Sequence, residues 1–416
     1  MIATEITNCR LCQSDKLDDL FDLGDHALSG CFPNASEQDA PVAPLKLCKC
    51  ATCHLVQLCY SVNLDEMFTS SYGYRSSLNA SMAKHLQELV NWTLGKCEAT
   101  NGDLVLDIGA NDGTLLKSYP VSGLKKVGID PIISKFQDYY TDSTICYEDF
   151  FSCEKAKKLF KKGEIKIITS ISMFYDLPDP SDFVAGIAWS LSKNGIWVLE
   201  QSYLPSMLES NSFDTICHEH LEYYALEQIQ ILAEQHGLEI IDVQLNDCNG
   251  GSFRVAVAHK NHPHQTNQSN INALRAAEQK LQLHELQTYD KFINRVDLLG
   301  QKLLSFLVNA KKSGQSIYIY GASTKGNTLL QHYGIGADLI DGALEVNKDK
   351  FGARTPGTNI PILDEKEIFK LNPDYLLVLP WHFRDDILQR SKNYIDAGIA
   401  FIFPLPEFDI VAHTQR

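Results

Sequence analysis

The sequence predicts an α/β protein with a small cysteine-rich module followed by two Rossmann-like domains, and three observations support this fold class. Seven of the 12 cysteines occur in the first sixty residues. Apolar runs of strand length then alternate with helical stretches, as in doubly wound folds with a mainly parallel sheet. Two of these runs, in DLVLDIGANDG and SIYIYGASTKG, end in a glycine turn that opens a helix. We predict domains at 1–75, 76–265 and 266–416 of the 416 residues.

Charge and hydropathy narrow the classes of function before any motif is considered. The net charge is −15 and the hydrophobic fraction is 44%. A nucleic-acid-binding protein normally carries a basic face, so the acidic balance argues against such a partner. No apolar run approaches the ~20 residues of a membrane helix, and MIATEITNCRLC lacks a basic region followed by an apolar stretch. We therefore expect a cytoplasmic protein with no nucleic acid or membrane partner, acting as a monomer or weak oligomer.

The N-terminal cysteines indicate a metal site rather than disulfides, because the chain is large and shows no secretory signal. Two C-x-x-C pairs have the spacing of zinc knuckles, and we predict that four thiolates bind one Zn²⁺: Cys9, Cys12, Cys50 and Cys53. Cys48 and Cys59 are rival ligands in the same sheet-like run. Four thiolates leave no open coordination position, so the zinc would be structural and would hold a module too small to fold alone.

The first glycine turn predicts the site of a positively charged nucleoside cofactor. It has the pattern GxxxG after an aspartate, not the GxGxxG of a dinucleotide-binding turn. That pattern favours S-adenosylmethionine; an acid ending the next run would bind the ribose hydroxyls, and residues after the third run would contact adenine. The predicted cofactor-binding residues are Asp107, Gly109, Asp112, Gly113, Asp130, Asp149 and Phe150. The alternative, a turn whose glycines serve packing alone, stays open.

A polar stretch at His262–Asn270 predicts a linker, in which His262 and His264 would be solvated. The next stretch predicts a long amphipathic helix whose apolar face has threes-and-fours spacing: Phe292, Val296, Leu299, Leu303, Phe306 and Ala310.

The second glycine turn predicts a phosphate site of lower specificity. It is not a Walker sequence, because its lysine precedes the second glycine. Small residues, hydroxyls and a lysine at a helix N-terminus nevertheless suit the diphosphate of a nucleotide-linked substrate. The predicted ligands are Ser323, Lys325, Gly326 and Asn327, and a purely structural turn is an equal alternative.

Taken together, the motifs resemble the sugar C-methyltransferases of bacterial deoxysugar pathways, which methylate C3 of nucleotide-linked 4-keto sugars. The motifs that carry the resemblance span nearly the whole chain: CRLC, CATCHLVQL, YGYRSSLN, DIGANDGTLL, CHEHLEYY, NGGSFRV, GASTKGNTLL, TPGTNIPI and VLPWHF. The resemblance implies a zinc-binding module, a central class I methyltransferase domain that binds S-adenosylmethionine, and a third domain that helps to hold a nucleotide-linked 4-keto-6-deoxy sugar.

The resemblance also implies a role for CHEHLEYY. A zinc-protease HExxH is absent, because Glu222 stands three residues after Glu219. By resemblance, His220 is the general base that removes the C3 proton beside the ketone. A donor must then stabilise the enolate oxygen, and the resemblance assigns this neighbourhood to Glu219 and to Tyr72 or Tyr74, between which the sequence does not choose.

One position departs from the family pattern, where a tyrosine commonly precedes HEH and this chain has Cys217. A thiol is a poorer hydrogen-bond donor than a phenol. Either the substrate carries a different substituent near C3, such as hydroxyl rather than amino, or another group supplies the contact. Arg254, after NGGSF, is a further candidate substrate ligand, whereas His85 on an amphipathic stretch is expected to serve packing.

Other functions stay open at this point. The same base could serve a sugar O- or N-methyltransferase, which would keep a C3 deuterium that C-methylation must lose. A nucleotide-sugar oxidoreductase with two Rossmann-like domains is disfavoured, because neither turn has the sequence GxGxxG. An adaptor or RNA-binding protein is disfavoured by the acidic charge.

Overall fold

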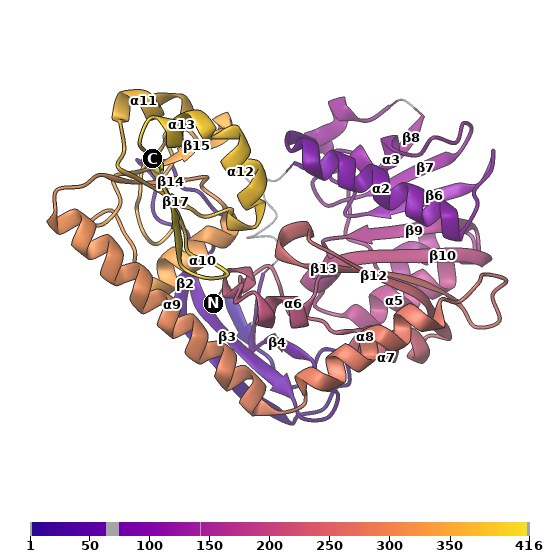
Figure 1. Cartoon of the computed structure of the whole chain (residues 1–416). Helices are drawn as coiled ribbons and strands as arrows, with labels where there is room; N and C mark the ends of the chain where they lie inside the picture. Colours follow the sequence, from indigo (N-terminus) through magenta and orange to yellow (C-terminus); the bar gives the residue numbers. More distant parts are fainter. Residues whose placement is uncertain (1, 64–74, 142, 414–416) are drawn as a thin grey trace.

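The computed structural model describes residues 2–63, 75–141 and 143–413, which form three lobes (Figure 1). Three large sheets of four, seven and six strands and a two-stranded sheet organise these residues. The α/β class and its order along the chain, a small module followed by two Rossmann-like sheets, are confirmed. The domain bounds at residues 75 and 265 stay predictions.

The N-terminal module is built on an antiparallel sheet with the order β11-β4-β3-β2. Its strands are β2 (Leu17–Ala27), β3 (Val42–Cys50), β4 (Val56–Leu58) and, from much later in the chain, β11 (Glu222–Tyr223). A separate pair joins β1 (Ala3–Glu5) to β5 (Tyr60–Val62). Because β11 directly follows the CHEHL sequence, the edge of the module's sheet holds the end of that motif.

The central sheet has seven strands in the order β12-β13-β10-β9-β6-β7-β8. Its strands are β6 (Leu104–Ile108), β7 (Lys125–Ile129), β8 (Thr144–Tyr147), β9 (Ile165–Ile171), β10 (Leu191–Ser202), β12 (Leu238–Asn246) and β13 (Ser252–His259). All neighbours are parallel except those of β13, so the predicted mainly parallel sheet is confirmed.

Helices cover both faces of the central sheet, as strand alternation requires. On β6, Val105 packs in one apolar cluster with α2, whereas Leu106 packs in the opposite cluster with α5. The helices of this lobe are α2 (Ala80–Lys96), α3 (Thr114–Lys117), α4 (Cys153–Leu159), α5 (Pro180–Ser190), α6 (Leu204–Glu209) and α7 (Leu226–Gln235).

The C-terminal sheet has the order β16-β15-β14-β17-β18-β19 and is parallel except for β19. Its strands are β14 (Ile317–Tyr320), β15 (Gly342–Glu345), β16 (Ile362–Asp364), β17 (Tyr375–Val378), β18 (Ala400–Phe403) and β19 (Asp409–Val411). The helices are α10 (Thr324–Tyr333), α11 (Ile368–Leu371), α12 (Arg384–Arg390) and α13 (Lys392–Asp396).

Two helices connect the central and C-terminal sheets. The predicted long helix is α9 (Leu286–Lys312), and its apolar stripe packs in the same cluster as β14 and β17. Phe306 is partly buried and packs against this cluster, and Leu307, which was not among the predicted residues, is fully buried in it.

The predicted linker is partly helical, because α8 (Gln268–Leu281) begins inside it with Asn267 as its N-cap. Its histidines are not solvated as expected. The rings of His262 and His264 stack with centroids 5.6 Å apart, and the His262 side chain is 6% exposed.

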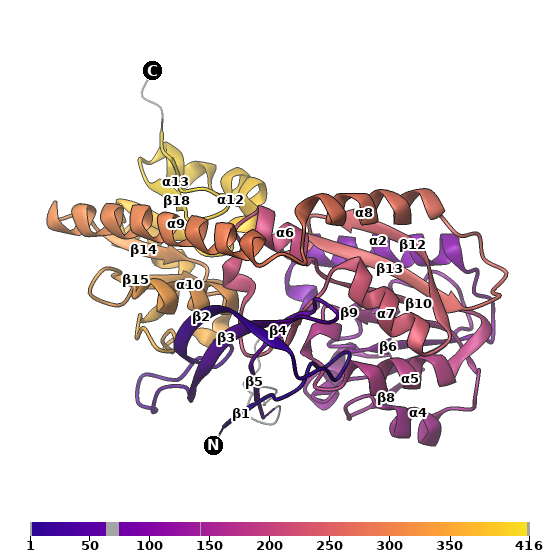
Figure 2. The same ribbon diagram turned by 90° about the horizontal axis from the view of Figure 1, so that it is seen from below.

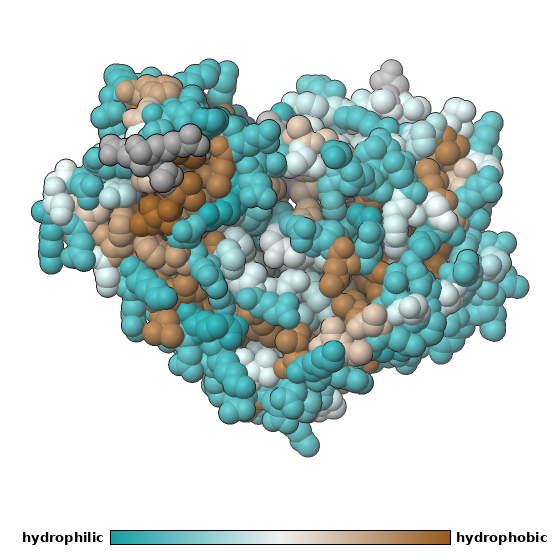
Figure 3. Space-filling model, in the orientation of Figure 1, coloured by the Kyte–Doolittle hydropathy of each residue, from teal (hydrophilic) through white to brown (hydrophobic). Residues whose placement is uncertain are grey.

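The three lobes meet around α10 (Figures 1 and 2). The central and C-terminal lobes form the arms of a V with the N-terminal module between them, and the face that joins the arms is hollowed (Figure 3). Gln331 on α10 hydrogen-bonds both backbone groups of Ala27 in the N-terminal module, and Thr328 donates to the carbonyl of Ile216 at 2.9 Å. Among the described helices, none is long and apolar enough to cross a membrane.

Candidate active site and zinc centre

The four predicted zinc ligands meet at one end of the N-terminal module. The Sγ atoms of Cys9, Cys12, Cys50 and Cys53 all lie within 4.8 Å of one another, and two pairs are 3.5 Å apart. A tetrahedron of zinc–sulfur bonds has edges of about 3.8 Å, so the cluster fits one Zn²⁺. The residue after each C-x-x-C pair, Gln13 or His54, has a left-handed backbone conformation, with φ of 62° and 60°, and reverses the chain direction. The rivals Cys48 and Cys59 instead hydrogen-bond with each other.

The zinc module is connected directly to the CHEHLEYY segment. Arg10, inside the first knuckle, donates to the carbonyl of Leu58 at 2.8 Å and lies 3.6 Å from the carboxylate of Glu222. Gln228 on α7 donates to the carbonyl of Cys53 at 2.9 Å. These contacts from the zinc knuckles hold β11, the strand that follows His220. A structural zinc therefore helps to position the site without contacting it.

A cavity of about 350 Å³ lies at the carboxyl ends of β6, β7 and β9. Its acidic lining residues are Asp107, Asp130, Asp149, Asp176, Asp179 and Asp182, and no lysine, arginine or histidine is among the described residues that line it. Such a wall repels phosphate and favours a cation or a ligand rich in hydroxyl groups. The cavity thus fits S-adenosylmethionine better than a dinucleotide.

The backbone of the first glycine turn forms part of the wall of this cavity. Gly109 has φ +73°, and a Cβ there would lie 2.9 Å from Cγ of Met173, so only glycine allows this approach. Burial raises the pKa of Asp107 to about 7, although Thr169 donates to its carboxylate at 2.6 Å. Burial also raises the pKa of Asp130, whose two oxygens accept the backbone N–H groups of Asn111 and Ile132.

Five of the seven predicted cofactor-binding residues line the cavity, and two do not. Asp112 is buried beneath the turn, where Oδ1 accepts from the hydroxyl of Thr114 at 2.6 Å. The Cα of Gly113 faces the ring of Tyr140, whose Cε1 would be 2.7 Å from a Cβ there. Both residues therefore shape the helix start rather than face the cavity, which corrects their predicted role.

His220 lies in a turn between α6 and β11, not on a strand or helix. Its Nδ1 is 2.8 Å from the carbonyl oxygen of Thr215. A carbonyl can only accept, so Nδ1 carries the proton and Nε2 holds a lone pair in the neutral ring. The ring of Tyr175 packs against the imidazole with centroids 4.2 Å apart. Burial, together with the positive charge of Lys325, lowers the pKa of His220 to about 3.

The residues that precede His220 are buried with it. Burial raises the pKa of Cys217 well above its usual value, and the nearby carboxylates Glu219 and Asp176 act in the same direction. Glu219 is 8% exposed and lies against Gly30 of the N-terminal module, where a Cβ would be 2.6 Å from its Oε1. The zinc module therefore contributes its backbone to the wall around Glu219.

The second glycine turn differs from the predicted diphosphate cradle. The Ser323 hydroxyl accepts the backbone N–H of Gly326 at 3.1 Å, and a Cβ on Gly326 would lie 2.5 Å from Leu379. Asn327 donates to the carbonyl of Ser29 at 2.8 Å. Three of the four predicted ligands therefore have structural roles: Ser323 caps α10, Gly326 packs against Leu379, and Asn327 binds the N-terminal module. These roles arise because α10 lies between the lobes.

The fourth predicted ligand, Lys325, points into the region of His220. Its Nζ donates to the carbonyl of Asn249 at 2.8 Å. Burial lowers the pKa of Lys325, while the carboxylate of Asp214 and the thiol of Cys217 favour its charge. Its positive charge in turn lowers the pKa of both His220 and His382. The GASTKG, CHEHL, NGG and WHF motifs, distant in sequence, therefore surround one lysine.

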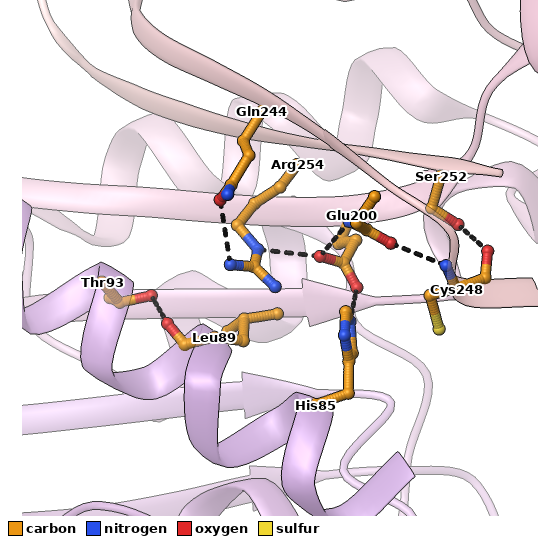
Figure 4. Close-up of polar contacts among 9 residues, drawn as sticks. His85, Leu89, Thr93, Glu200, Gln244, Cys248, Ser252 and Arg254 are labelled. Carbon is orange, nitrogen blue, oxygen red and sulfur yellow. Dashed lines mark hydrogen bonds and ion pairs between the residues drawn. The ribbon is translucent and has the colours of Figure 1, made fainter. Parts of the chain in front are cut away.

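A buried charge cluster joins α2 to β10 and β13 (Figure 4). Glu200 contacts Nε2 of His85 through one oxygen and accepts from Nε of Arg254 at 2.7 Å through the other. Burial alone would lower the pKa of His85, but Cys248 and Glu200 raise it to about 10. Arg254 is thus committed to an internal ion pair rather than to a ligand, and His85 does more than pack, which corrects both expectations.

Some residues of the site were missed from the sequence, and others lie outside the described part. Tyr72 and Tyr74 fall in the segment 64–74, outside the described residues. Gly30 and Asp176 belong to no motif of known chemistry, so only the three-dimensional contact identifies them. Lys350 was also missed; its Nζ donates to the carbonyl of Ala322 at 2.8 Å, beside the second glycine turn.

Comparisons with known proteins agree with this arrangement. Three family models match consecutive parts of the chain: a zinc binding domain at residues 9–68, a methyltransferase domain at 74–243 and a C-methyltransferase C-terminal domain at 247–406. Over 415 residues, 99% of this chain and 98% of the relative, the sequence is 29% identical to C-methyltransferase NovU of Streptomyces niveus. The chain is an S-adenosylmethionine-dependent C-methyltransferase.

Two further proteins align with only part of this chain. A ubiquinone biosynthesis O-methyltransferase of Colwellia psychrerythraea is 26% identical over 153 residues, which are 33% of this chain and 61% of that protein. The structure of a geranyl diphosphate C-methyltransferase of Streptomyces coelicolor A3(2) aligns with 43% of this chain and 80% of its own, at 13% identity and a TM-score of 0.35.

Proposed function

We propose that this C-methyltransferase methylates C3 of a nucleotide-linked 4-keto-6-deoxyhexose through an enolate, with His220 as the general base. The observation that carries the proposal is the hydrogen bond from Nδ1 of His220 to the carbonyl of Thr215, at 2.8 Å. This bond fixes the tautomer and leaves Nε2 as a proton acceptor. A hydrogen beside a ketone is acidic enough for an imidazole to remove, because the electron pair delocalises onto the ketone oxygen.

The lowered pKa keeps His220 neutral at physiological pH, which a base requires, but it also makes the ring a weak base. Negative charge on the substrate changes this balance. A bound anion near Lys325 offsets the lysine charge that disfavours the imidazolium, so proton transfer to Nε2 becomes easier as the enolate forms. We therefore assign Lys325 to the negative charge of the substrate rather than to a helix-end phosphate site.

The acidic cavity supports the assignment of the methyl donor. Asp107 and Gly109 would face the amino-acid part and sulfonium, Asp130 would bind the ribose, and Asp149 and Phe150 would contact adenine. When bound, S-adenosylmethionine supplies an electrophilic methyl group. Met173 and Tyr175, two positions apart in the segment that follows β9, connect the cavity wall with the ring of His220.

The substrate side of the proposal rests on Cys217, Glu219 and Lys325, which lie around His220. Lys350 extends the positive charge along the second glycine turn, since its Nζ is 2.8 Å from the carbonyl of Ala322. Tyr72 and Tyr74 remain candidate donors to the enolate oxygen.

One incubation tests the proposal. The enzyme is mixed with S-adenosylmethionine and a panel of nucleotide-linked 4-keto-6-deoxysugars deuterated at C3, and the products are analysed by mass spectrometry. We expect one methyl group to be gained and the C3 deuterium to be lost. A methylated product that retains the deuterium would show transfer to oxygen or nitrogen and would end the proposal.

A further inference from the structure

Asp176 occupies a position shared by the cofactor cavity and the His220 turn. It ends the short helix η3 (Phe174–Asp176) after β9 and lines the cavity. The carbonyl of the preceding residue, Tyr175, accepts the backbone N–H of Leu221 at 2.7 Å, and its ring packs against His220 at a tilt of 58°. One backbone hydrogen bond and one ring contact therefore hold η3 against the His220 turn. As a result, the Asp176 carboxyl lies at the boundary between the methyl-donor cavity and the base.

One oxygen of the Asp176 carboxyl group has no hydrogen-bond partner among the described residues. This atom, Oδ1, is buried. A buried ion without a partner is costly, so such a carboxyl group takes up a proton instead.

The ionisable groups that face Asp176 reinforce this state. Burial raises the pKa of Asp176 well above its usual value, and the carboxylates of Glu219 and Glu222 raise it further. Cys217 and Tyr223, on the same neighbouring segment, are weak acids whose own pKa values are raised mainly by burial, and neither supplies a positive charge to Asp176. Of the cations nearby, Arg10 lies on Glu222 at 3.6 Å.

The remaining acids of the cavity wall supply no positive charge to Asp176. They are Asp107, Asp130, Asp149, Asp179 and Asp182. Lys325, the cation near His220, is paired electrostatically with Asp214 rather than with Asp176. All of these surroundings favour the neutral carboxylic acid.

We propose that Asp176 is a catalytic residue that keeps its proton and donates a hydrogen bond to the ketone oxygen of the substrate as negative charge develops there. This inference rests on the proposed enolate reaction. Nε2 of His220 takes the proton from C3, the electron pair of that C–H bond moves onto the ketone oxygen, and the Asp176 O–H stabilises it without transferring its proton. An ionised carboxylate in the same place would repel the enolate, whereas an acid kept neutral by an apolar site can stabilise one.

Two substitutions separate this role from that of a charged ligand. Asp176→Asn keeps a donor of nearly the same shape but cannot ionise, and Asp176→Ala removes the donor. We expect Asp176→Ala to lose on the order of 10²–10³ in kcat, as loss of one oxyanion donor does elsewhere. Asp176→Asn should retain kcat within about tenfold and should lose the fall in kcat at alkaline pH that the wild type shows when Asp176 ionises.

Asp179→Asn is the matched control, because it removes one negative charge from the same cavity wall and keeps the amide cap for Asp182. It should leave the alkaline fall unchanged. Binding of S-adenosylmethionine and bound zinc are measured for every variant, which confirms the fold. The inference is overturned if Asp176→Asn is as inactive as Asp176→Ala, because a charge would then be needed. It is overturned equally if Asp176→Ala keeps full kcat, or if the variants lose only affinity for S-adenosylmethionine.

The exchange of C3 deuterium with solvent distinguishes the two proposals. If the wild type does not exchange it, the proposed function fails. If the wild type exchanges it but Asp176→Asn does not, the enolate reaction stands and only the role of Asp176 fails.

Discussion

Gly30→Ala tests whether the zinc module takes part in the active site. The added Cβ would lie 2.6 Å from Oε1 of Glu219, whereas ordinary contact begins at 3.4 Å. The φ of Gly30 lies outside the left-handed region, so the backbone itself accepts alanine. The carboxylate of Glu219 must therefore retreat by about 0.8 Å, and a shift of that size in a catalytic group lowers kcat by roughly 10–100-fold.

The same substitution should have little effect on stability. The added Cβ displaces only the end of the Glu219 side chain, which lowers the free energy of unfolding by about 1 kcal/mol. Replacing glycine also makes the unfolded chain less flexible, which raises the free energy of unfolding by about 0.4–1 kcal/mol. We expect kcat to fall while the midpoint of urea unfolding stays close to that of the wild type.

Gly95→Ala is the control, because nothing lies within 4 Å of its Cβ position on α2. If Gly30→Ala keeps full kcat, Glu219 is not positioned by the zinc module and the reasoning is refuted.

Three further predictions follow from the same contacts. Cys50→Ser should abolish zinc binding measured by mass spectrometry and lower the free energy of unfolding by more than about 4 kcal/mol, and an unchanged zinc content would contradict the four-thiolate site. Gly109→Ala should weaken S-adenosylmethionine binding at least about tenfold in calorimetry, whereas Gly237→Ala, with the same φ of +73° but no atom within 4 Å, should not. Lys325→Met should raise the pKa of His220 by removing a neighbouring cation, and the acid limb of the pH profile of kcat should move up by about one pH unit, not down.

The fold was largely predictable because its signals are local. Alternating apolar runs predict the strands of both sheets, and the paired C-x-x-C spacing predicts a cluster that the four Sγ atoms confirm. The strand β11 was not predictable in this way. It has two residues, and its pairing with β4 depends on a contact across more than 160 positions of the chain.

The site was less predictable, because a sequence motif identifies the types of residue but not the direction in which their side chains point. Ser323 and Gly326 are residue types that are common in phosphate-binding turns. In the structure, however, the Ser323 hydroxyl caps α10, and Gly326 leaves room for the side chain of Leu379. Arg254 follows a conspicuous NGG sequence, yet it is committed to Glu200. Conversely, Gly30 and Asp176 carry no local signal, because their importance arises from burial against segments that folding brings together.

The most direct test of the account is the exchange of C3 deuterium by His220→Ala. Wild-type enzyme, incubated with a C3-deuterated nucleotide-linked 4-keto-6-deoxysugar, should release the label to water. His220→Ala should release none above the uncatalysed rate, while His236→Ala should release it as the wild type does, because the His236 ring bonds Ser181 on α5 and neither residue lines the cavity. Exchange by His220→Ala at the wild-type rate would contradict the assignment of the base.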